Sequence, residues 1–463
     1  MIRPSGRLAN VRAHAGIFER SSPIPSTPSM GAGMKAARLP AKRLRRFLAV
    51  LGPGIVTGAA DDDPSGIFTY SQSGAQFGLG QLWTVLFMLP LLIGVQEMAT
   101  RIAIATNQGI ATVIRKNYSK VWLYGIVGLL VLTNTINLGA DLGAMAESSR
   151  LLVNLPYIPY VLIFGVAGLL LEILLPYRRY APYLKILTVS LLAYFITGFI
   201  ATQNWRRVFR AVFLPQIHFD FQFLMILVGV LGTTISPYMF FWQAAQQREE
   251  DQESGKTGKG FIPGLIRDMR IDTFTGMIFS QIATWFIILT TGEVLYTHGV
   301  HTIRSAAQAA AALEPLVQRF PHSGKISELL FALGILGTGL LAVPIFAASS
   351  AYAICDSFGW RDSLALRPRQ ARVFYGVIVA GTAIGASLNY LRIDPIRALI
   401  YAAVLNGAAA PPMIFLLIRI AGKKEIMGSY TSGAASKIFN WITFACMTAA
   451  VVLAGYAFLF PAR

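Results

Sequence analysis

Eleven long apolar stretches dominate this sequence and restrict what it can fold into. Charged residues make up 13% of the 463 residues and hydrophobic residues 54%, whereas about 25% of a soluble domain is charged. A soluble protein of this size cannot bury that much apolar surface, and about 20 apolar residues of helix cross a bilayer core about 30 Å thick. We therefore predict an all-α integral membrane protein.

The predicted spans are separated by polar connections. They cover residues 47–79, 81–105, 121–153, 158–175, 182–201, 221–247, 271–291, 326–358, 371–391, 394–421 and 438–460. Lys and Arg gather in alternate connections, which predicts a cytoplasmic N-terminus and an outer C-terminus. One group departs from this rule, because Arg206, Arg207 and Arg210 fall on the predicted outer side.

The first 46 residues carry ten Lys or Arg against one acid, Glu19, and are rich in Ser, Pro and Gly. This composition is typical of disordered segments. We interpret 1–46 as a disordered basic cytoplasmic arm that contacts anionic lipid. The arm explains much of the net charge of +18 without nucleic acid as a partner. The two cysteines, Cys355 and Cys446, lie far apart in apolar stretches and predict neither a metal site nor a disulfide.

Two spans are interrupted, and they correspond to each other. The first contains GPGIVTGAADDDPSG at 52–66, and the sixth contains GVLGTTISPY at 229–238. Pro and Gly break a helix there, and freed carbonyls at membrane depth are tolerated where they line a cavity. Two packing kinks are the simpler alternative. Broken helices that begin two five-span halves indicate the midplane site of an inverted-repeat transporter. We predict repeats over 47–201 and 202–421, followed by an eleventh span and C-terminus over 422–463.

Three consecutive acids, Asp61, Asp62 and Asp63, adjoin the first break, and the span holds no Lys or Arg beside them. A carboxylate near the bilayer centre costs several kcal/mol unless it faces a cavity or a partner. A cation is the obvious compensating species, and hard divalent cations take carboxylate, carbonyl and water oxygens. The break offers these oxygen types.

At these residues the chain resembles the Nramp family of divalent-metal transporters, which has the leucine-transporter fold. The resemblance covers all spans and includes QEMATRIAIATNQG from Gln96 and GTTISPYMFFWQ from Gly232. Nramp proteins carry Asp-Pro-Gly-Asn in span one and Met-Pro-His in span six. This chain has Asp-Pro-Ser-Gly at 63–66 and Ser-Pro-Tyr at 236–238.

The resemblance implies a metal site and no enzyme activity or cofactor. Its expected members are the Asp63 carboxylate, the Ala60 and Thr233 carbonyls, Ser236 and the space at Gly66. Secondary candidates are Asp62, Thr234, Tyr238 and Asn406. Ser236 in place of Met leaves hard oxygen ligands, and Gly66 in place of Asn removes a ligand and is expected to open space. Because Mg²⁺ retains several waters, these departures favour the Nramp-related magnesium transporters, with Mn²⁺ as the second choice of cargo.

Proton coupling is expected to be weak or absent. Tyr238 replaces the family's His, and a tyrosine hydroxyl does not exchange protons readily near neutral pH. Asp141 matches a family acid in span three, whereas Ala144 stands where a second acid is expected. Asp141 and Asn137 are candidates for a proton pathway, and an interhelical hydrogen bond is the alternative for both.

Other function classes stay open as alternatives. They are a proton-coupled Mn²⁺/Fe²⁺ symporter, a Na⁺-coupled amino-acid carrier of the same fold, a membrane-embedded enzyme, and a scaffold or receptor. Three aspartates would repel an amino-acid carboxylate, and no loop has a recognisable catalytic spacing. The predicted partners are divalent metal ions and the lipid bilayer, and the predicted location is a bacterial inner membrane.

Overall fold

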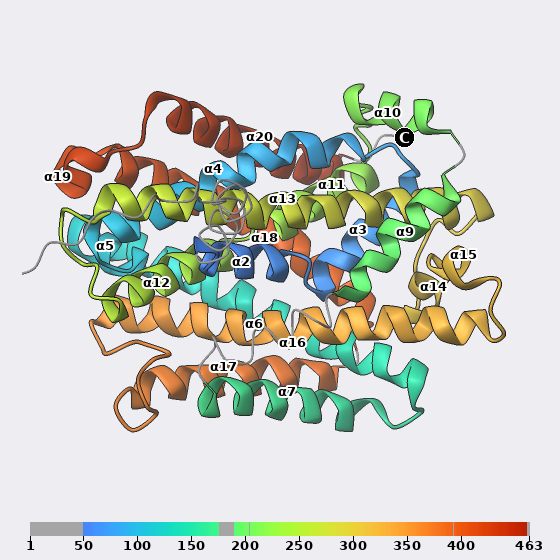
Figure 1. The fold of residues 1–463 in the computed structure, drawn as a ribbon, viewed down its shortest axis with the longest axis horizontal. Coiled ribbons are helices and arrows are strands. Elements are labelled where there is room, and N and C mark those ends of the chain that lie inside the picture. The colour runs from blue at the N-terminus through green and yellow to red at the C-terminus, as the bar shows by residue number, and fades with distance from the viewer. Residues whose placement is uncertain (1–49, 176–188, 203, 392, 461–463) are drawn as a thin grey trace, which may run out of the picture. The chain divides into compact units, whose positions relative to one another are not determined.

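The computed structural model describes residues 50–175, 189–202, 204–391 and 393–460. The predicted basic arm over 1–46, the start of the first predicted span and the first part of the fifth lie outside these residues. Throughout the described ranges the regular structure is helical, as expected. Figure 1 shows the arrangement of the helices.

The helices follow one another in this order: α2 (Pro53–Asp61), α3 (Pro64–Phe77), α4 (Trp83–Thr106), α5 (Ile110–Asn117), α6 (Lys120–Leu152), α7 (Tyr157–Leu174), α9 (Leu192–Ala201), α10 (Trp205–Phe213), α11 (Phe221–Thr234), α12 (Pro237–Glu253), α13 (Ile262–Val294), α14 (Ala306–Ala311), α15 (Glu314–Val317), α16 (Ser323–Phe358), α17 (Arg372–Leu388), α18 (Pro395–Gly422), α19 (Lys424–Met427) and α20 (Ala434–Leu459).

Nine apolar helices within the described ranges are long enough to cross a membrane, with α11 and α12 taken as one interrupted span. Each of the nine overlaps one predicted span. The first predicted span is the pair α2 and α3, each too short to cross alone. The described part of the fifth consists of a 3-10 turn (Val189–Leu191) and α9.

The helix contacts reveal an internal repeat. The pair α3–α13 has its counterpart in α12–α4, and α9–α13 has its counterpart in α18–α4. Likewise, α6–α7 matches α16–α17, and α6–α17 matches α16–α7. In Figure 1 the chain passes through α2 and α3 in one direction and through α11 and α12 in the opposite direction. These features indicate two inverted five-helix repeats, with α20 as the additional span.

Helix α13 supports α2 at every fourth residue. The Asp272 carboxylate accepts hydrogen bonds from the backbone amides of Gly52, Gly54 and Ile55 at 2.6–2.9 Å. It thereby satisfies amides that the start of a helix leaves without intrahelical partners. One turn further along α13, Gly276 lies against the α2 backbone. These contacts, four residues apart on α13, fix the position of α2 relative to α13 on the way to the helix break.

We predict that Gly58→Ala destabilises the protein, because an added Cβ would overlap the Gly276 carbonyl of α13. Overpacking a close helix contact costs about 1–3 kcal/mol or more. The measurement is the thermal unfolding temperature of the purified protein, read from tryptophan fluorescence. Gly125→Ala in α6 is the matched control, since apart from the neighbouring backbone of α6 itself no atom of the described residues lies within 4 Å of a Cβ there. Equal unfolding temperatures for the two variants would contradict the close contact.

Candidate functional site

The first break lies where the sequence predicts it. Helix α2 ends at Asp61 and α3 begins at Pro64. The Asp63 carboxylate caps α3 and accepts hydrogen bonds from the Gly66 amide at 2.6 Å and from the Ser65 hydroxyl at 2.7 Å. The positive end of the α3 dipole also favours a negative charge at this position. Local sequence alone therefore places the Asp63 carboxylate at the unwound segment.

The second break faces the first. Helix α11 ends at Thr234 and α12 begins at Pro237. The Ser236 hydroxyl lies 2.6 Å from the carbonyl oxygens of both Gly232 and Thr233, which the break leaves free. The Thr233 side-chain oxygen lies 3.3 Å from the Ser65 hydroxyl of the first break. The ends of α3 and α11 that border the two breaks thus meet through side-chain oxygens.

Tyr238 joins two of the predicted ligands. Its hydroxyl lies 3.2 Å from an Asp63 carboxylate oxygen and 3.3 Å from the Ala60 carbonyl oxygen. The Ser236 hydroxyl contacts the Thr233 carbonyl in the same way. Each of the two carbonyls that the sequence predicts as ligands is thus contacted by a hydroxyl. The predicted oxygen groups therefore lie close together, and the hydroxyls of Tyr238 and Ser236 form hydrogen bonds with the two carbonyls.

The expected open space at Gly66 is absent, and that prediction was wrong for this structure. An added Cβ at Gly66 would lie 3.1 Å from the Asp61 carbonyl, 3.2 Å from the Tyr70 ring and 3.3 Å from the Thr233 side-chain oxygen. The volume that an asparagine would need is occupied by neighbours from three segments. Gly66 therefore permits close packing of the two breaks.

The other two acids point away from Asp63. Asp61 contacts the Ser280 hydroxyl, and an Asp62 carboxylate oxygen lies 3.2 Å from the Thr284 hydroxyl. Ser280 and Thr284 are one helical turn apart on α13. They continue the series of α13 residues, spaced by four, that begins with Asp272 and Gly276. We did not predict either hydroxyl, although two polar residues spaced by four in an apolar span were a usable signal. Asp62 therefore shares no hydrogen-bond partner with Asp63 among the described residues.

The remaining candidates occupy a polar layer between helices. Asn137 of α6 and Asn406 of α18 exchange two hydrogen bonds, at 3.0 and 3.1 Å. This contact is the interhelical bond considered as the alternative for Asn137. Thr234 pairs with the Tyr70 hydroxyl at 2.9 Å. Asp141 differs, because neither of its carboxylate oxygens has a side-chain hydrogen-bond partner among the described residues.

Asp141 nevertheless belongs to the same electrostatic environment as the break. Its charge interacts with that of Asp63 and with the backbone amide of Ser65. Both carboxylates are fully buried. A second buried carboxylate within the field of Asp63 is a group that a cation or a proton would stabilise.

The site is closed to solvent. Asp63, Ala60, Ser236 and Tyr238 each have an exposed fraction of 0%, and Thr233 has 1%. Among the described residues, no three His, Cys, Asp or Glu side chains converge into a set that could hold a metal ion. A cation held here would be bound by one carboxylate together with carbonyl and hydroxyl oxygens.

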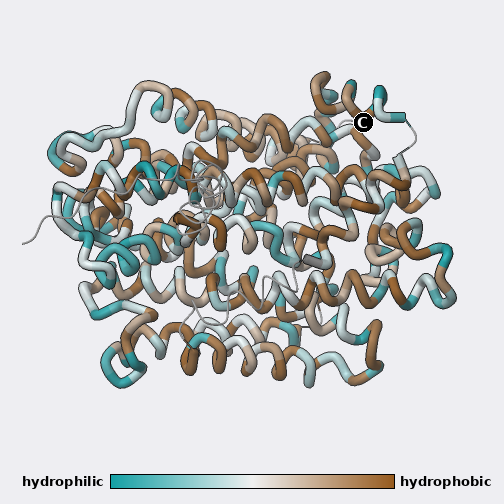
Figure 2. The backbone as a smooth tube through the Cα atoms, in the orientation of Figure 1, coloured by the Kyte–Doolittle hydropathy of each residue, from teal (hydrophilic) through white to brown (hydrophobic). Residues whose placement is uncertain are grey.

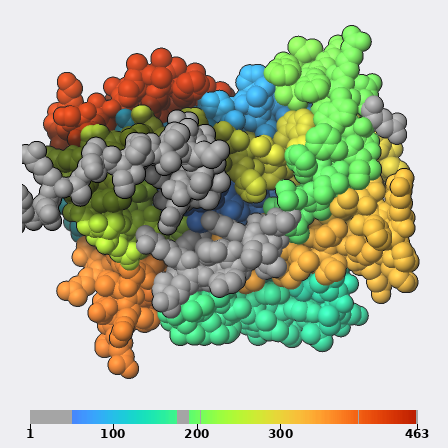
Figure 3. All heavy atoms as spheres, viewed as in Figure 1, coloured from blue at the N-terminus to red at the C-terminus, as the bar shows by residue number. Residues whose placement is uncertain are grey.

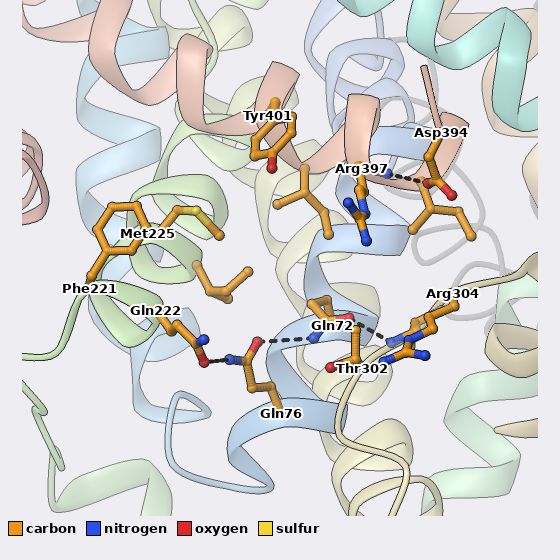
Figure 4. Close-up of a pocket in the computed structure, with 14 residues that line it drawn as sticks. Gln72, Gln76, Phe221, Gln222, Met225, Thr302, Arg304, Asp394, Arg397 and Tyr401 are labelled. Atoms are coloured by element: carbon orange, nitrogen blue, oxygen red, sulfur yellow. Dashed lines mark hydrogen bonds between the residues drawn. The ribbon is translucent and has the colours of Figure 1, made fainter. Parts of the chain in front are cut away.

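A pocket of about 400 Å³ lies on the predicted outer side of the site, between α3, α11 and α18. Figure 4 shows glutamines from α3 and α11 on one wall and Arg397 and Tyr401 on another. The Gln72 side chain accepts a hydrogen bond from the Ile303 amide at 2.9 Å and donates one to the His301 carbonyl at 3.2 Å. It therefore ties the connection after α13 to α3 above the site.

Ion pairs join helices at the predicted cytoplasmic end. Arg248 of α12 lies 3.4 Å from Asp356 of α16 and 2.6 Å from Asp362 in the following connection. Burial, together with the Asp356 charge, raises the pKa of Asp362 to about 6, against the opposing effect of Arg248. Buried pairs of this kind are costly to break one partner at a time. The contacts tie the second broken span to α16.

Comparisons with known proteins agree with this architecture. Residues 54–457 match the Nramp family, described as natural resistance-associated macrophage protein-like. A relative named divalent metal cation transporter MntH, from Caldanaerobacter subterraneus subsp. tengcongensis, is 22% identical over 86% of this chain and 90% of its own length.

Two solved structures show the same fold. A manganese transporter from Eremococcus coleocola superposes with a TM-score of 0.68 at 17% identity, covering 94% of this chain and 91% of that one. MhsT in complex with L-phenylalanine superposes with a TM-score of 0.56 at 12% identity, covering 87% of this chain and 98% of that one. The expected leucine-transporter fold is confirmed.

Proposed function

Because the chain belongs to the Nramp family, we propose that it transports divalent metal cations across a membrane, with Mg²⁺ or Mn²⁺ as the cargo. The observation that carries this proposal is the buried Asp63 carboxylate at the meeting point of two broken helices. A relative and a structural neighbour are named as divalent-metal and manganese transporters, which supports a metal cation as the ligand of that carboxylate.

The preference for Mg²⁺ or Mn²⁺ rests on hard oxygen groups. The Asp63 carboxylate, the Ala60 and Thr233 carbonyls and the Ser236 hydroxyl offer oxygen atoms, which suit these two ions. The hydroxyls of Ser236 and Tyr238 now bond to the carbonyls. We propose that these hydroxyls turn away or exchange with the cation when it binds, so that the carbonyl oxygens become ligands.

We further propose that proton coupling is weak or absent. In place of the family's histidine, Tyr238 holds the Asp63 carboxylate with a neutral hydroxyl. One observation favours the alternative of a proton-coupled symporter. Asp141 is buried near Asp63 without a side-chain hydrogen-bond partner among the described residues, and a carboxylate at that depth is suited to carry a proton.

The topology belongs to the same proposal. We propose that the arm over 1–46 is cytoplasmic, that the repeats cover 47–201 and 202–421, and that the protein lies in a bacterial inner membrane. The orientation can be tested in a variant in which Cys355→Ala and Cys446→Ala remove the native cysteines. A single cysteine is then introduced either in the arm or at the C-terminus and is labelled with a membrane-impermeant thiol reagent. Labelling of the arm from outside intact cells would contradict it.

The transport experiment uses purified protein in liposomes that contain a metal-sensitive dye. We expect uptake of Mn²⁺, competition of Mg²⁺ with Mn²⁺ at millimolar concentration, and no dependence on Na⁺ or amino acids. Protein-free liposomes and the Asp63→Asn variant are the controls. An uptake rate equal to that of protein-free liposomes for every divalent ion would contradict the proposed function.

We predict that Ser236→Met moves selectivity toward soft metals. A thioether sulfur favours transition metals over Mg²⁺, so Cd²⁺ should inhibit Mn²⁺ uptake at a concentration lower by about tenfold, which is about 1.4 kcal/mol. Competition curves for Cd²⁺ and Mg²⁺ give the measurement. Ser236→Ala is the control, because it removes the same hydroxyl without adding sulfur. Identical Cd²⁺ curves in the two variants would show that this position does not face the cation.

A further inference from the structure

Helix α10 carries the arginines that depart from the expected charge distribution. Its nine residues include Arg206, Arg207 and Arg210. The helix lies between the fifth and sixth spans, outside the transport site, and Figure 3 shows it at the surface in light green. Nothing in the transport mechanism explains three positive charges there.

The residues of α10 divide into three sectors. Successive residues of an α-helix are about 100° apart, which places Val208 and Val212 together, and both are buried against the bundle. Phe209 and Phe213 occupy a neighbouring sector and are 56% and 62% exposed. The arginines lie beyond them. A helix with exposed aromatic residues on one flank and arginines on another is typical of the membrane interface. Figure 2 shows both hydrophobic and hydrophilic residues on this helix.

A pocket of about 420 Å³ lies beside the arginines. Arg207, Arg210, Gln216 and Tyr296 line it together with the turn at 77–80, and the lining contains no Asp or Glu. In the described part of the chain, neither guanidinium lies within ion-pair distance of a carboxylate. Glu293 interacts with Arg207 at longer range and is not part of the lining. The pocket therefore presents positive charge and hydrogen-bond donors without a protein anion.

We propose that this pocket binds the phosphate of an anionic phospholipid headgroup. Guanidinium groups hold phosphate oxygens with paired, charge-assisted hydrogen bonds, and the Tyr296 hydroxyl and the Gln216 amide can donate further ones. Phe209 and Phe213 favour a lipid over free phosphate as the source, because they hold α10 at the depth where headgroups lie. This site is independent of the proposed transport function.

The test counts lipids bound to the purified full-length protein by native mass spectrometry, as phosphatidylglycerol or phosphatidylcholine is added. We expect phosphatidylglycerol to bind preferentially. In Arg207→Gln/Arg210→Gln its half-saturation concentration should rise by about tenfold, as expected for the loss of paired charged hydrogen bonds. Arg206→Gln is the matched control, since it removes one charge from the same helix without altering the pocket lining, and a change of less than about threefold is expected.

Three results would overturn the proposal. The first is equal binding of the two lipids, and the second is an equal loss in Arg206→Gln and in the double variant, which would indicate a diffuse surface charge. The third is that inorganic phosphate raises the thermal unfolding temperature as much as phosphatidylglycerol does. This result would identify a free anion as the ligand. If the double variant does not fold, Arg210→Gln alone is judged by the same criteria against Arg206→Gln.

Discussion

Replacing Asp63 by asparagine is expected to abolish metal transport and to leave the fold intact. Asparagine caps a helix about as well as aspartate, so the hydrogen bond to the Gly66 amide is retained. The negative charge that Asp63 places beside Tyr238 and the Ala60 carbonyl is lost. Metal uptake into liposomes should fall by about 100-fold or more, equivalent to at least about 2.7 kcal/mol. Alanine is the poorer test, since losing the cap alone costs about 1 kcal/mol.

Asp62→Asn is the matched control for this prediction. Its carboxylate faces Thr284 of α13 instead of the Asp63 cluster, and asparagine can accept the same hydrogen bond. We expect a loss of less than about tenfold. Size-exclusion profiles and unfolding temperatures establish that both variants are folded. Normal uptake in Asp63→Asn, or an equal loss in both variants, would place the cation elsewhere along the acidic run.

Metal uptake without proton uptake is the second large expected effect. If the metal ion moves alone, each transport cycle carries two charges, and a potential of 100 mV contributes about 4.6 kcal/mol at about 2.3 kcal/mol per charge. Uptake of Mn²⁺ and Mg²⁺ should therefore increase strongly with an inside-negative potential. A pH dye in the lumen should report no acidification at a fixed potential.

Asp141 provides the control for coupling. Asp141→Asn keeps the side-chain volume and removes the only carboxylate in α6 that interacts with Asp63. If coupling is absent, this variant should leave the lumenal pH trace unchanged. Proton influx that follows metal influx and disappears in Asp141→Asn would show a proton-coupled symporter, and our interpretation of Tyr238 would then be wrong.

The helices and their interruptions could be predicted because the signals are local. A span needs about 20 consecutive apolar residues, and a break needs Pro with Gly within a few residues of it. Pro64 and Pro237 begin the second halves of the two broken spans as expected. The Asp63 cap is equally local, since its donors lie two and three residues along the chain. These features depend on neighbouring residues and on the lipid solvent.

The partners of the site residues were decided by the tertiary structure. Tyr238 reaches Ala60 across 178 positions, Asp61 reaches Ser280 across 219, and Asn137 reaches Asn406 across 269. The sequence does not indicate which residues of helices so far apart in the chain lie opposite one another. The space at Gly66 shows the same limit, because Gly66 in place of the family's Asn suggested an opening that Tyr70 and Thr233 fill. Side-chain volume between helices is set by how closely their backbones approach, and that distance arises only when all the spans pack together.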